Sequence, residues 1–172
     1  SSEQCNKCPL GTWLDTDKAT SRGSCINCVV GKYGDTDGAT SISACKDCIA
    51  GVEFQDAAGQ PSCKSAACGA GTYGTATDAT TAPTCTNCVA GRYSGATGLT
   101  SSDQCNKCPL GTWLNTAGAR SRNTCINCVV GKYGDIDGAT TIGACKDCIV
   151  GLEYQNVTGQ PSCKSAACGI GT

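Results

Sequence analysis

The sequence has very few of the side chains that build an ordinary hydrophobic core. It has no Met and one Phe, and Leu, Ile, Val and Phe together make up 23 of its 172 residues. That share is about 13%, below the level of about 20% at which a chain usually buries a core. Ordering the backbone costs about 1–2 kcal/mol per residue, and so little apolar surface cannot offset it. We therefore expect covalent cross-links in place of a single globular core.

Histidine, a strong net charge and long apolar runs are absent as well. The net charge is -1 and the sequence pI is about 5.3, so we expect no binding to nucleic acid. No run approaches the roughly 20 apolar residues of a membrane span, so we expect no membrane insertion in this segment. Without His the chain lacks the most common general base and metal ligand. We accordingly predict no enzyme activity, no catalytic or metal site and no cofactor.

Eighteen cysteines, about one residue in ten, follow a repeating pattern. Residues 1–72 and 101–172 align without a gap and are identical at 55 of 72 positions, which gives a long period of 100 residues. A shorter period of about 20 residues, marked by cysteine pairs, runs inside it. Such self-similarity is typical of a chain in which each unit packs mainly against its neighbours.

Five of the short modules make one long repeat. We divide the chain into a first long repeat, residues 1–100, with modules beginning near residues 5, 25, 45, 63 and 85, and an incomplete second long repeat, residues 101–172, with modules beginning near 105, 125, 145 and 163. The chain begins without a methionine or a secretory leader and stops in mid-period, so we expect a stretch of a longer product.

Every module has the same order of residue types. A Gly stands three residues after the second Cys in all nine modules, and we expect it to take a positive φ or to let the backbone pass close to a disulfide. An aromatic residue follows, and we expect its ring to lie over a disulfide as a miniature core. These structural aromatics are Trp13, Tyr33, Phe54, Tyr73, Tyr93, Trp113, Tyr133 and Tyr154.

The remainder of the module predicts turns and short strands. A polar stretch rich in Asp, Asn, Gly and Thr follows the aromatic and is typical of turns. No stretch has a helical period. The predicted fold class is a small disulfide-rich repeat: an elongated solenoid or rod of modules of about 20 residues, with short β-hairpins, little or no helix and no central hydrophobic core.

Two pairing schemes compete for the cysteines. A ladder joins the second Cys of each module to the first Cys of the next and can link any number of modules. A crossed scheme (Cys5–Cys25 with Cys8–Cys28) uses modules two at a time, which does not suit five modules per period, so we favour the ladder. Each closed loop of about 17 residues would contribute about 3 kcal/mol. The ladder pairs are Cys8–Cys25, Cys28–Cys45, Cys48–Cys63, Cys68–Cys85, Cys88–Cys105, Cys108–Cys125, Cys128–Cys145 and Cys148–Cys163, with Cys5 and Cys168 pairing outside this segment.

Metal binding is the rival interpretation of the cysteines. The spacing Cys-x2-Cys-x16-Cys-x2-Cys also fits a zinc ribbon, but zinc sites would again take modules in twos. A thioredoxin-type redox role is weaker still, because no βαβ pattern surrounds any pair. Structural disulfides are favoured, and they imply an extracellular or cell-surface location.

Few other residues suggest a site. The stretch Asp35–Gly38 resembles part of a calcium-binding loop without its remaining ligands, and an Asx turn is the favoured interpretation. The stretch Asn156–Thr158 is an N-glycosylation sequon, whose counterpart in the first long repeat is Asp56–Ala58. The abundant Ser and Thr fit either O-linked sugars or simple solubility. We predict covalent glycans, with Asn156 as the N-linked site.

The segments Cys5–Trp13 and Cys25–Tyr33 carry the pattern Cys-x-x-Cys-x-x-Gly-x-aromatic. They resemble the repeats written Cys-x-x-Cys-Pro-x-Gly-x-Tyr, which occur in ephrin-receptor-like and tumour-necrosis-factor-receptor-like modules. Tandem arrays with Ala/Thr/Gly-rich spacers are also similar to protist surface proteins, namely ciliate immobilisation antigens and mastigoneme shaft proteins. The resemblance extends over the whole chain, although Val or Ile replaces Pro in most modules. It implies the architecture more closely than the biological role.

A hydrophilic, cross-linked chain of near-identical repeats fits a structural role. We predict an extracellular structural protein: a disulfide-laddered, glycosylated segment of a long filament or cell-surface coat, such as a surface antigen. Its expected partners are neighbouring repeats of the same chain and like chains packed laterally. The alternative is the ligand-binding ectodomain of a receptor, which calls for one atypical exposed patch. The sequence offers only Val29-Val30 and Val129-Val130, which repeat.

Overall fold

The computed structural model describes residues 7–15, 24–76 and 78–166. Its regular structure consists of eight two-stranded sheets and a few single turns of 3-10 helix. Most strands are only two residues long, and several of them, such as Ile26–Asn27 and Lys32–Tyr33, lie between two cysteines or two glycines. The described residues contain no α-helix, in agreement with the predicted class of small disulfide-rich repeat.

Each sheet pairs the strand that carries the aromatic residue of one module with a strand at the cysteine pair of the next module. A hairpin is therefore shared between two modules. The pairs are β1 (Thr12–Trp13) with β2 (Ile26–Asn27), β3 (Lys32–Tyr33) with β4 (Lys46–Asp47), β5 (Glu53–Phe54) with β6 (Lys64–Ser65), β7 (Thr72–Thr75) with β8 (Thr84–Asn87), β9 (Arg92–Tyr93) with β10 (Asn106–Lys107), β11 (Thr112–Trp113) with β12 (Ile126–Asn127), β13 (Lys132–Tyr133) with β14 (Lys146–Asp147), and β15 (Glu153–Tyr154) with β16 (Lys164–Ser165).

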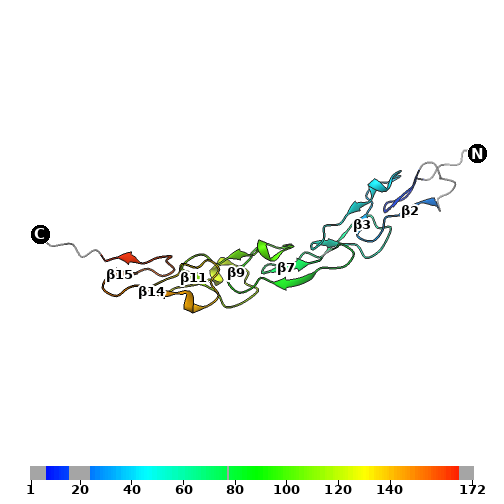
Figure 1. Cartoon of the computed structure of the whole chain (residues 1–172). Helices are drawn as coiled ribbons and strands as arrows, with labels where there is room; N and C mark the ends of the chain where they lie inside the picture. The colour runs from blue at the N-terminus through cyan, green and yellow to red at the C-terminus, as the bar shows by residue number, and fades with distance from the viewer. Residues whose placement is uncertain (1–6, 16–23, 77, 167–172) are drawn as a thin grey trace, which may run out of the picture. The chain divides into compact units, whose positions relative to one another are not determined.

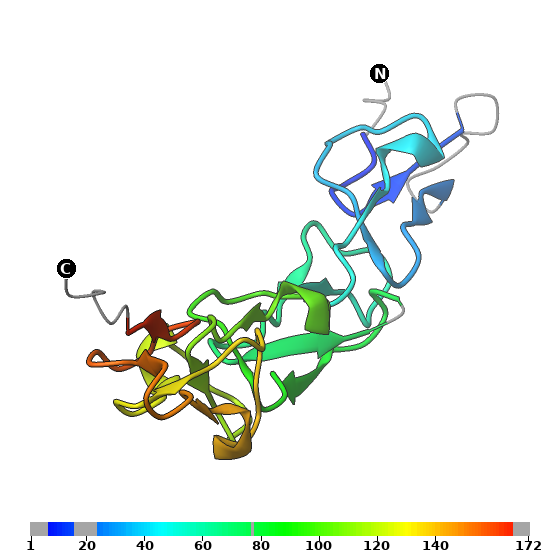
Figure 2. The same cartoon turned by 60° about the vertical axis from the view of Figure 1, so that its left-hand side comes forward.

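Short 3-10 turns precede the first cysteine of several modules. They are η3 (Ile42–Ala44), η4 (Ser102–Gln104), η5 (Arg122–Thr124) and η6 (Ile142–Ala144). Figure 2 shows η6, in orange, as a single short coil. The Oγ atoms of Ser41, Ser101 and Ser121 cap the first three by accepting a backbone hydrogen bond from two residues further on. One turn of helix is too short to leave a periodic pattern in the sequence.

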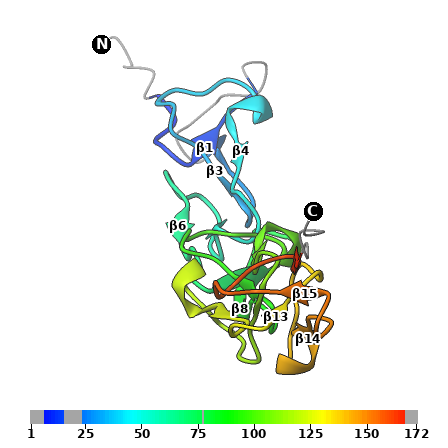
Figure 3. The same ribbon diagram turned by 90° about the vertical axis from the view of Figure 1, so that its left-hand side faces the viewer.

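The described chain packs as two compact units. The first contains the described residues of Ser1–Cys68, Gly74–Cys85 and Gly98–Thr100, and the second contains the described residues of Gly69–Tyr73, Thr86–Thr97 and Ser101–Thr172. Hairpins β1–β2, β3–β4 and β5–β6 belong to the first unit, and β9–β10, β11–β12, β13–β14 and β15–β16 to the second (Figure 1). Within the second unit β13 lies beside its partner strand β14 (Figure 3). The same hairpin is thus used repeatedly in both units.

Burial is concentrated at the cysteines and not at large apolar side chains. The second cysteine of each pair is nearly inaccessible, as at Cys88 and Cys108, which are both 0% exposed. In the second unit Cys108, Leu114 and Ala119 form a small cluster, against which the half-buried Tyr93 packs. Eighteen large hydrophobic residues of the described chain are exposed, so apolar packing stays local to each junction between modules.

Candidate functional site: the junction between modules

All sixteen cysteines in the described part of the chain are joined in eight disulfides, with Cα–Cα distances of 5.5 to 5.9 Å. The bridges join the same residues as the ladder, from Cys8–Cys25 to Cys148–Cys163. Cys5 and Cys168, which the ladder assigns to pairs outside this segment, lie outside the described residues. A disulfide sulfur offers no thiolate, so none of these sixteen residues can bind zinc. Within the described ranges no group of three or more His, Cys, Asp or Glu is placed to hold a metal ion.

Each disulfide closes the hairpin that two modules share. In the second unit, Cys125 directly precedes β12, whose Ile126 pairs with Trp113 of β11. On the other side, the backbone N–H and the Oγ1 hydroxyl of Thr112 both donate to the carbonyl oxygen of Pro109, at 3.2 and 2.6 Å. This turn aims the chain from Cys108 into β11. The hairpin and the bridge therefore fix each other's geometry.

Four backbone hydrogen bonds complete the junction. They link the Gly that follows a cysteine pair, the second cysteine itself and the residue after the aromatic to the next module. In the second unit they are Gly111 N–H to Gly134 O (2.7 Å), Cys128 N–H to Gly111 O (2.8 Å), Gly138 N–H to Cys108 O (2.8 Å) and Leu114 N–H to Ala139 O (2.9 Å). The counterparts at Gly11 and Gly34 in the first unit have the same pattern. Each module is thus held mainly by its neighbours.

Glycine is required at this junction for two reasons. The eight described glycines after cysteine pairs have φ between +78° and +85°, as in Gly111 at +79°, so the expected positive φ is confirmed. The expected close approach to a disulfide occurs at a different glycine. A Cβ on Gly134 would lie 3.2 Å from the Sγ atom of Cys128 and 3.1 Å from the Cα atom of Gly111.

The aromatic residues are half-buried, except for Tyr154, which is exposed. Tyr93 packs against the cluster that contains Cys108 and Cys125, which form the disulfide leaving the next module. Phe54 and Tyr154 have a different neighbour, since the ammonium groups of Lys64 and Lys164 lie 5.5 and 5.7 Å from the respective ring centroids. Such contacts are attractive because the face of an aromatic ring is electron-rich.

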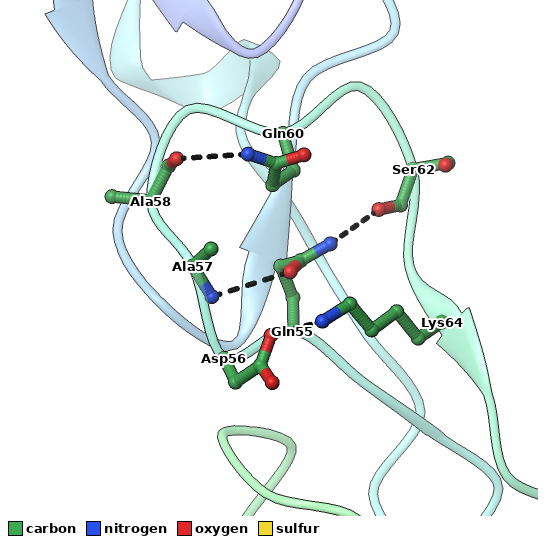
Figure 4. Close-up of polar contacts among 7 residues, drawn as sticks. All are labelled: Gln55, Asp56, Ala57, Ala58, Gln60, Ser62 and Lys64. Atoms are coloured by element: carbon green, nitrogen blue, oxygen red, sulfur yellow. Dashed lines mark hydrogen bonds and ion pairs between the residues drawn. The ribbon is translucent and has the colours of Figure 1, made fainter.

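The position directly after the aromatic is the buried one, and the sequence analysis did not single it out. Ser94 is 1% exposed there, and Gln55 and Leu114 are each 2% exposed. The Nε2 group of Gln55 donates to the carbonyl oxygen of Ser62 at 2.7 Å, and its Oε1 atom accepts from the N–H of Ala57 at 3.2 Å (Figure 4). The buried amide therefore holds the following turn together. A Gln at the same place in both long repeats is the signal that could have revealed it.

Lysine–aspartate pairs lie on the exposed side of the hairpins. The Nζ atom of Lys46 is 2.7 Å from Asp35, and that of Lys146 is 2.7 Å from Asp135. The hydrogen bond from Lys46 lowers the pKa of Asp35 below its usual value, and the same bond raises the pKa of Lys46. Both groups are exposed, so water and salt weaken the attraction. Asp35, a residue of the calcium-like stretch, is thus engaged by a lysine.

Hollows on the surface of the second unit include polar groups that already have partners. In one of them Arg92 donates to the carbonyl oxygen of Cys105 at 2.8 Å, and the Nζ atom of Lys107 lies 3.6 Å from Asp137. In the described chain no buried side-chain nitrogen or oxygen lacks a hydrogen-bond partner. These hollows resemble gaps between hairpins more than a shaped binding site.

Residues 1–45 match the family model described as tyrosine-protein kinase ephrin type A/B receptor-like. The resemblance to ephrin-receptor-like modules is therefore confirmed for this segment, which contains Cys8–Cys25 and Cys28–Cys45. No curated protein matches the chain. The matched module and the disulfide-rich repeat indicate an extracellular or secreted protein. Within the described ranges no helix has the length and apolarity that a bilayer crossing requires.

Proposed function

We propose that the chain is a segment of an extracellular structural filament or cell-surface coat. The observation that carries this proposal is the recurrence of one junction, a disulfide-closed hairpin with the same backbone hydrogen bonds, in both long repeats. Because a junction involves mainly adjacent modules, further modules can be added without changing those already present. Extension by repetition is what a filament or coat needs.

The near-identity of the two long repeats supports a lattice role. Residues 1–72 and 101–172 differ at only 17 positions, so the same surface recurs every 100 residues. A lattice uses such recurrence, because each contact along it can then be made in the same way. In this proposal the cysteines, the glycines and the aromatics build the scaffold, and the polar turns face solvent.

Like chains packed side by side are the proposed partners. A β-branched residue follows the second cysteine in several modules and is left exposed: Val29 at 59%, Val89 at 54% and Val129 at 55%. The net charge of the chain is -1, so two copies repel each other only weakly. Every copy carries these exposed side chains at the same positions along its sequence. Replacing the three valines by Ser should lower self-association in sedimentation experiments. Unchanged sedimentation would contradict this surface.

An extended form can be tested on the secreted 172-residue chain by small-angle X-ray scattering. A compact chain of this length has a radius of gyration of about 16 Å. We expect a clearly larger value and a cross-section that stays constant along the particle. Electron microscopy of the native material should show long fibres or a regular coat. A compact scattering profile, or isolated particles with one globular end, would contradict the filament.

A ligand-binding receptor ectodomain is the second candidate, and the family match of residues 1–45 favours it. It predicts monomers that bind a soluble or cell-bound protein through one distinctive patch. Cross-linking of the chain at a cell surface separates the two proposals. Links between copies of the chain support the structural role, whereas links to a single different protein support the receptor.

A further inference from the structure

The turn after β15 brings a tyrosine, an asparagine and a lysine together on one face. Tyr154 ends β15 (Glu153–Tyr154), and Asn156 lies two residues further on. Lys164 of β16 contacts both of them. Its Nζ atom is 2.9 Å from the Oδ1 atom of Asn156 and 5.7 Å from the centroid of the Tyr154 ring.

We call the face formed by Tyr154, Asn156 and Lys164 the platform. The buried residue between Tyr154 and Asn156 holds this platform in place. Gln155 is 5% exposed, donates to the carbonyl oxygen of Ser162 at 2.7 Å and accepts from the N–H of Val157 at 3.2 Å. The side chain of Gln155 thus connects the two ends of the turn on its buried side. The disulfide Cys148–Cys163 closes the same segment. Asn156 is therefore presented on a structured turn.

The platform and the residues next to it are open to solvent. Asn156 and Thr158 are exposed, and Tyr154 and Val157 are each 47% exposed. The hydrogen bond from Lys164 uses the amide oxygen of Asn156, so the amide nitrogen, to which a sugar is attached, is not consumed by it. Asn156–Thr158 is also the one Asn-x-Ser/Thr stretch in the sequence.

We propose that Asn156 carries an N-linked glycan and that its first sugar packs on the exposed part of the Tyr154 ring. Attachment forms a bond between Nδ2 of Asn156 and the anomeric carbon of an oligosaccharide carried on a lipid pyrophosphate. The lipid pyrophosphate leaves, and the amide nitrogen loses one proton. The aromatic body of Tyr154 offers an apolar, electron-rich surface to the C–H groups of a pyranose ring.

The first long repeat contains the same platform without the acceptor. Gln55 holds its turn as Gln155 does, and Lys64 lies 5.5 Å from the Phe54 ring. Asp56 stands in place of Asn156 and forms an ion pair with Lys64 at 2.5 Å. Ala58 replaces the Thr of the sequon. The glycan is therefore assigned to one of the two repeats, and the other provides a matched control.

Occupancy is tested on the full chain secreted from a eukaryotic host. Digestion with peptide N-glycosidase converts a glycosylated Asn156 into Asp, which mass spectrometry detects. We expect this conversion in the unmodified chain and its loss in Asn156→Gln and Thr158→Ala. The double variant Asp56→Asn/Ala58→Thr should gain a second glycan, at residue 56. An unmodified Asn156 in the secreted chain would overturn the proposal.

Contact with the ring is tested separately, by hydrogen exchange of residues 149–163 after trimming the glycan to its first sugar. We expect exchange to slow by about threefold to tenfold relative to Asn156→Gln, the scale of one aromatic contact. Tyr154→Phe should keep this protection and Tyr154→Ala should lose it. A non-reducing peptide map must show Cys148–Cys163 intact in both variants. Equal protection in Tyr154→Ala would overturn the packing.

This inference rests on the proposed function only in requiring secretion. Glycan occupancy at Asn156 does not depend on whether chains assemble. A glycosylated chain that stays monomeric would contradict the filament and leave the site intact. A chain that assembles while Asn156 stays unmodified would contradict the glycan site and leave the filament proposal intact.

Discussion

The backbones of Gly111 and Gly159 are in contact, although Gly159 belongs to the turn two modules further along the chain. A Cβ on Gly111 would lie 2.2 Å from the carbonyl oxygen of Gly159. Gly159 in turn donates its N–H to the carbonyl oxygen of Cys128, in the module between them, at 2.9 Å. Three successive modules therefore meet at one point, and a methyl group would separate them.

This contact predicts different outcomes for two glycines with the same backbone conformation. Gly111 and Gly31 have φ of +79° and +80°, but the nearest atom to a Cβ on Gly31 would be the Cγ2 methyl group of Thr80, at 3.3 Å. Substitution by Ala costs about 1–2 kcal/mol at either site for the left-handed backbone. Gly111→Ala must in addition displace the turn of Gly159. We expect hydrogen exchange to speed up more around Gly159 in Gly111→Ala than around Thr80 in Gly31→Ala, and equal acceleration would contradict the backbone contact.

Removing the buried amide of Gln155 should loosen its turn. Gln155→Ala leaves the carbonyl oxygen of Ser162 and the N–H of Val157 without this partner, a loss of about 1–3 kcal/mol for a buried group. Limited proteolysis between residues 156 and 163 should speed up accordingly. Gln160→Ala is the matched control, because the Nε2 group of Gln160 makes only a 3.3 Å bond to Thr158. Similar cleavage of the two variants would contradict this role of Gln155.

Deleting one bridge should have a local effect. The double variant Cys108→Ser/Cys125→Ser opens a loop with a sequence separation of 17, which the chain-entropy model values at about 3 kcal/mol. It also disturbs the cluster around Leu114. We expect hydrogen-exchange protection to fall in β11 and β12 and to persist in β3 and β4. Loss of protection throughout the chain would show one cooperative fold instead.

The lysine–aspartate pairs predict a modest dependence on pH. The hydrogen bond from Lys146 lowers the pKa of Asp135 below its usual value of 3.8. A lowered pKa in the folded chain means that the stabilising effect is present above pH 3.8 and is lost as the pH falls through the folded pKa. A carboxyl titration by NMR should therefore show Asp135 ionising below pH 3.8, and added salt should reduce the shift. A midpoint at or above 3.8 would contradict the pairing.

Much of the junction follows from the sequence, because its components have distinctive residue types. The odd number of modules per long repeat favoured the ladder, and an unvarying Gly after each cysteine pair led to the positive φ seen at Gly111. Both inferences depend on covalent or steric requirements that only one residue type meets. The two-residue strands likewise follow from the short distance between cysteines and turns.

The buried position after the aromatic could not be deduced in the same way. Its occupants include Leu114, Ser94, Gln55 and Gly134, which share neither size nor polarity. Burial there is decided by the backbone bond to the next module, as from Leu114 to Ala139, and each side chain fits the remaining space differently. The contact between Gly111 and Gly159 was equally hidden, because no residue pattern reports packing two modules away.

The pairing of cysteines in successive loops determines how the chain would carry tension. The bridge Cys108–Cys125 spans 5.8 Å between Cα atoms, so a pull on the backbone bypasses the residues between them. Force then passes to Cys128 through Ile126 and Asn127, which are held in strand β12. A break in a turn inside a loop leaves the load path unbroken, whereas a cut at β12 severs it. The contour length is thus set by the bridges and by links of two residues, or of four between Cys63 and Cys68, and extension does not straighten the loops.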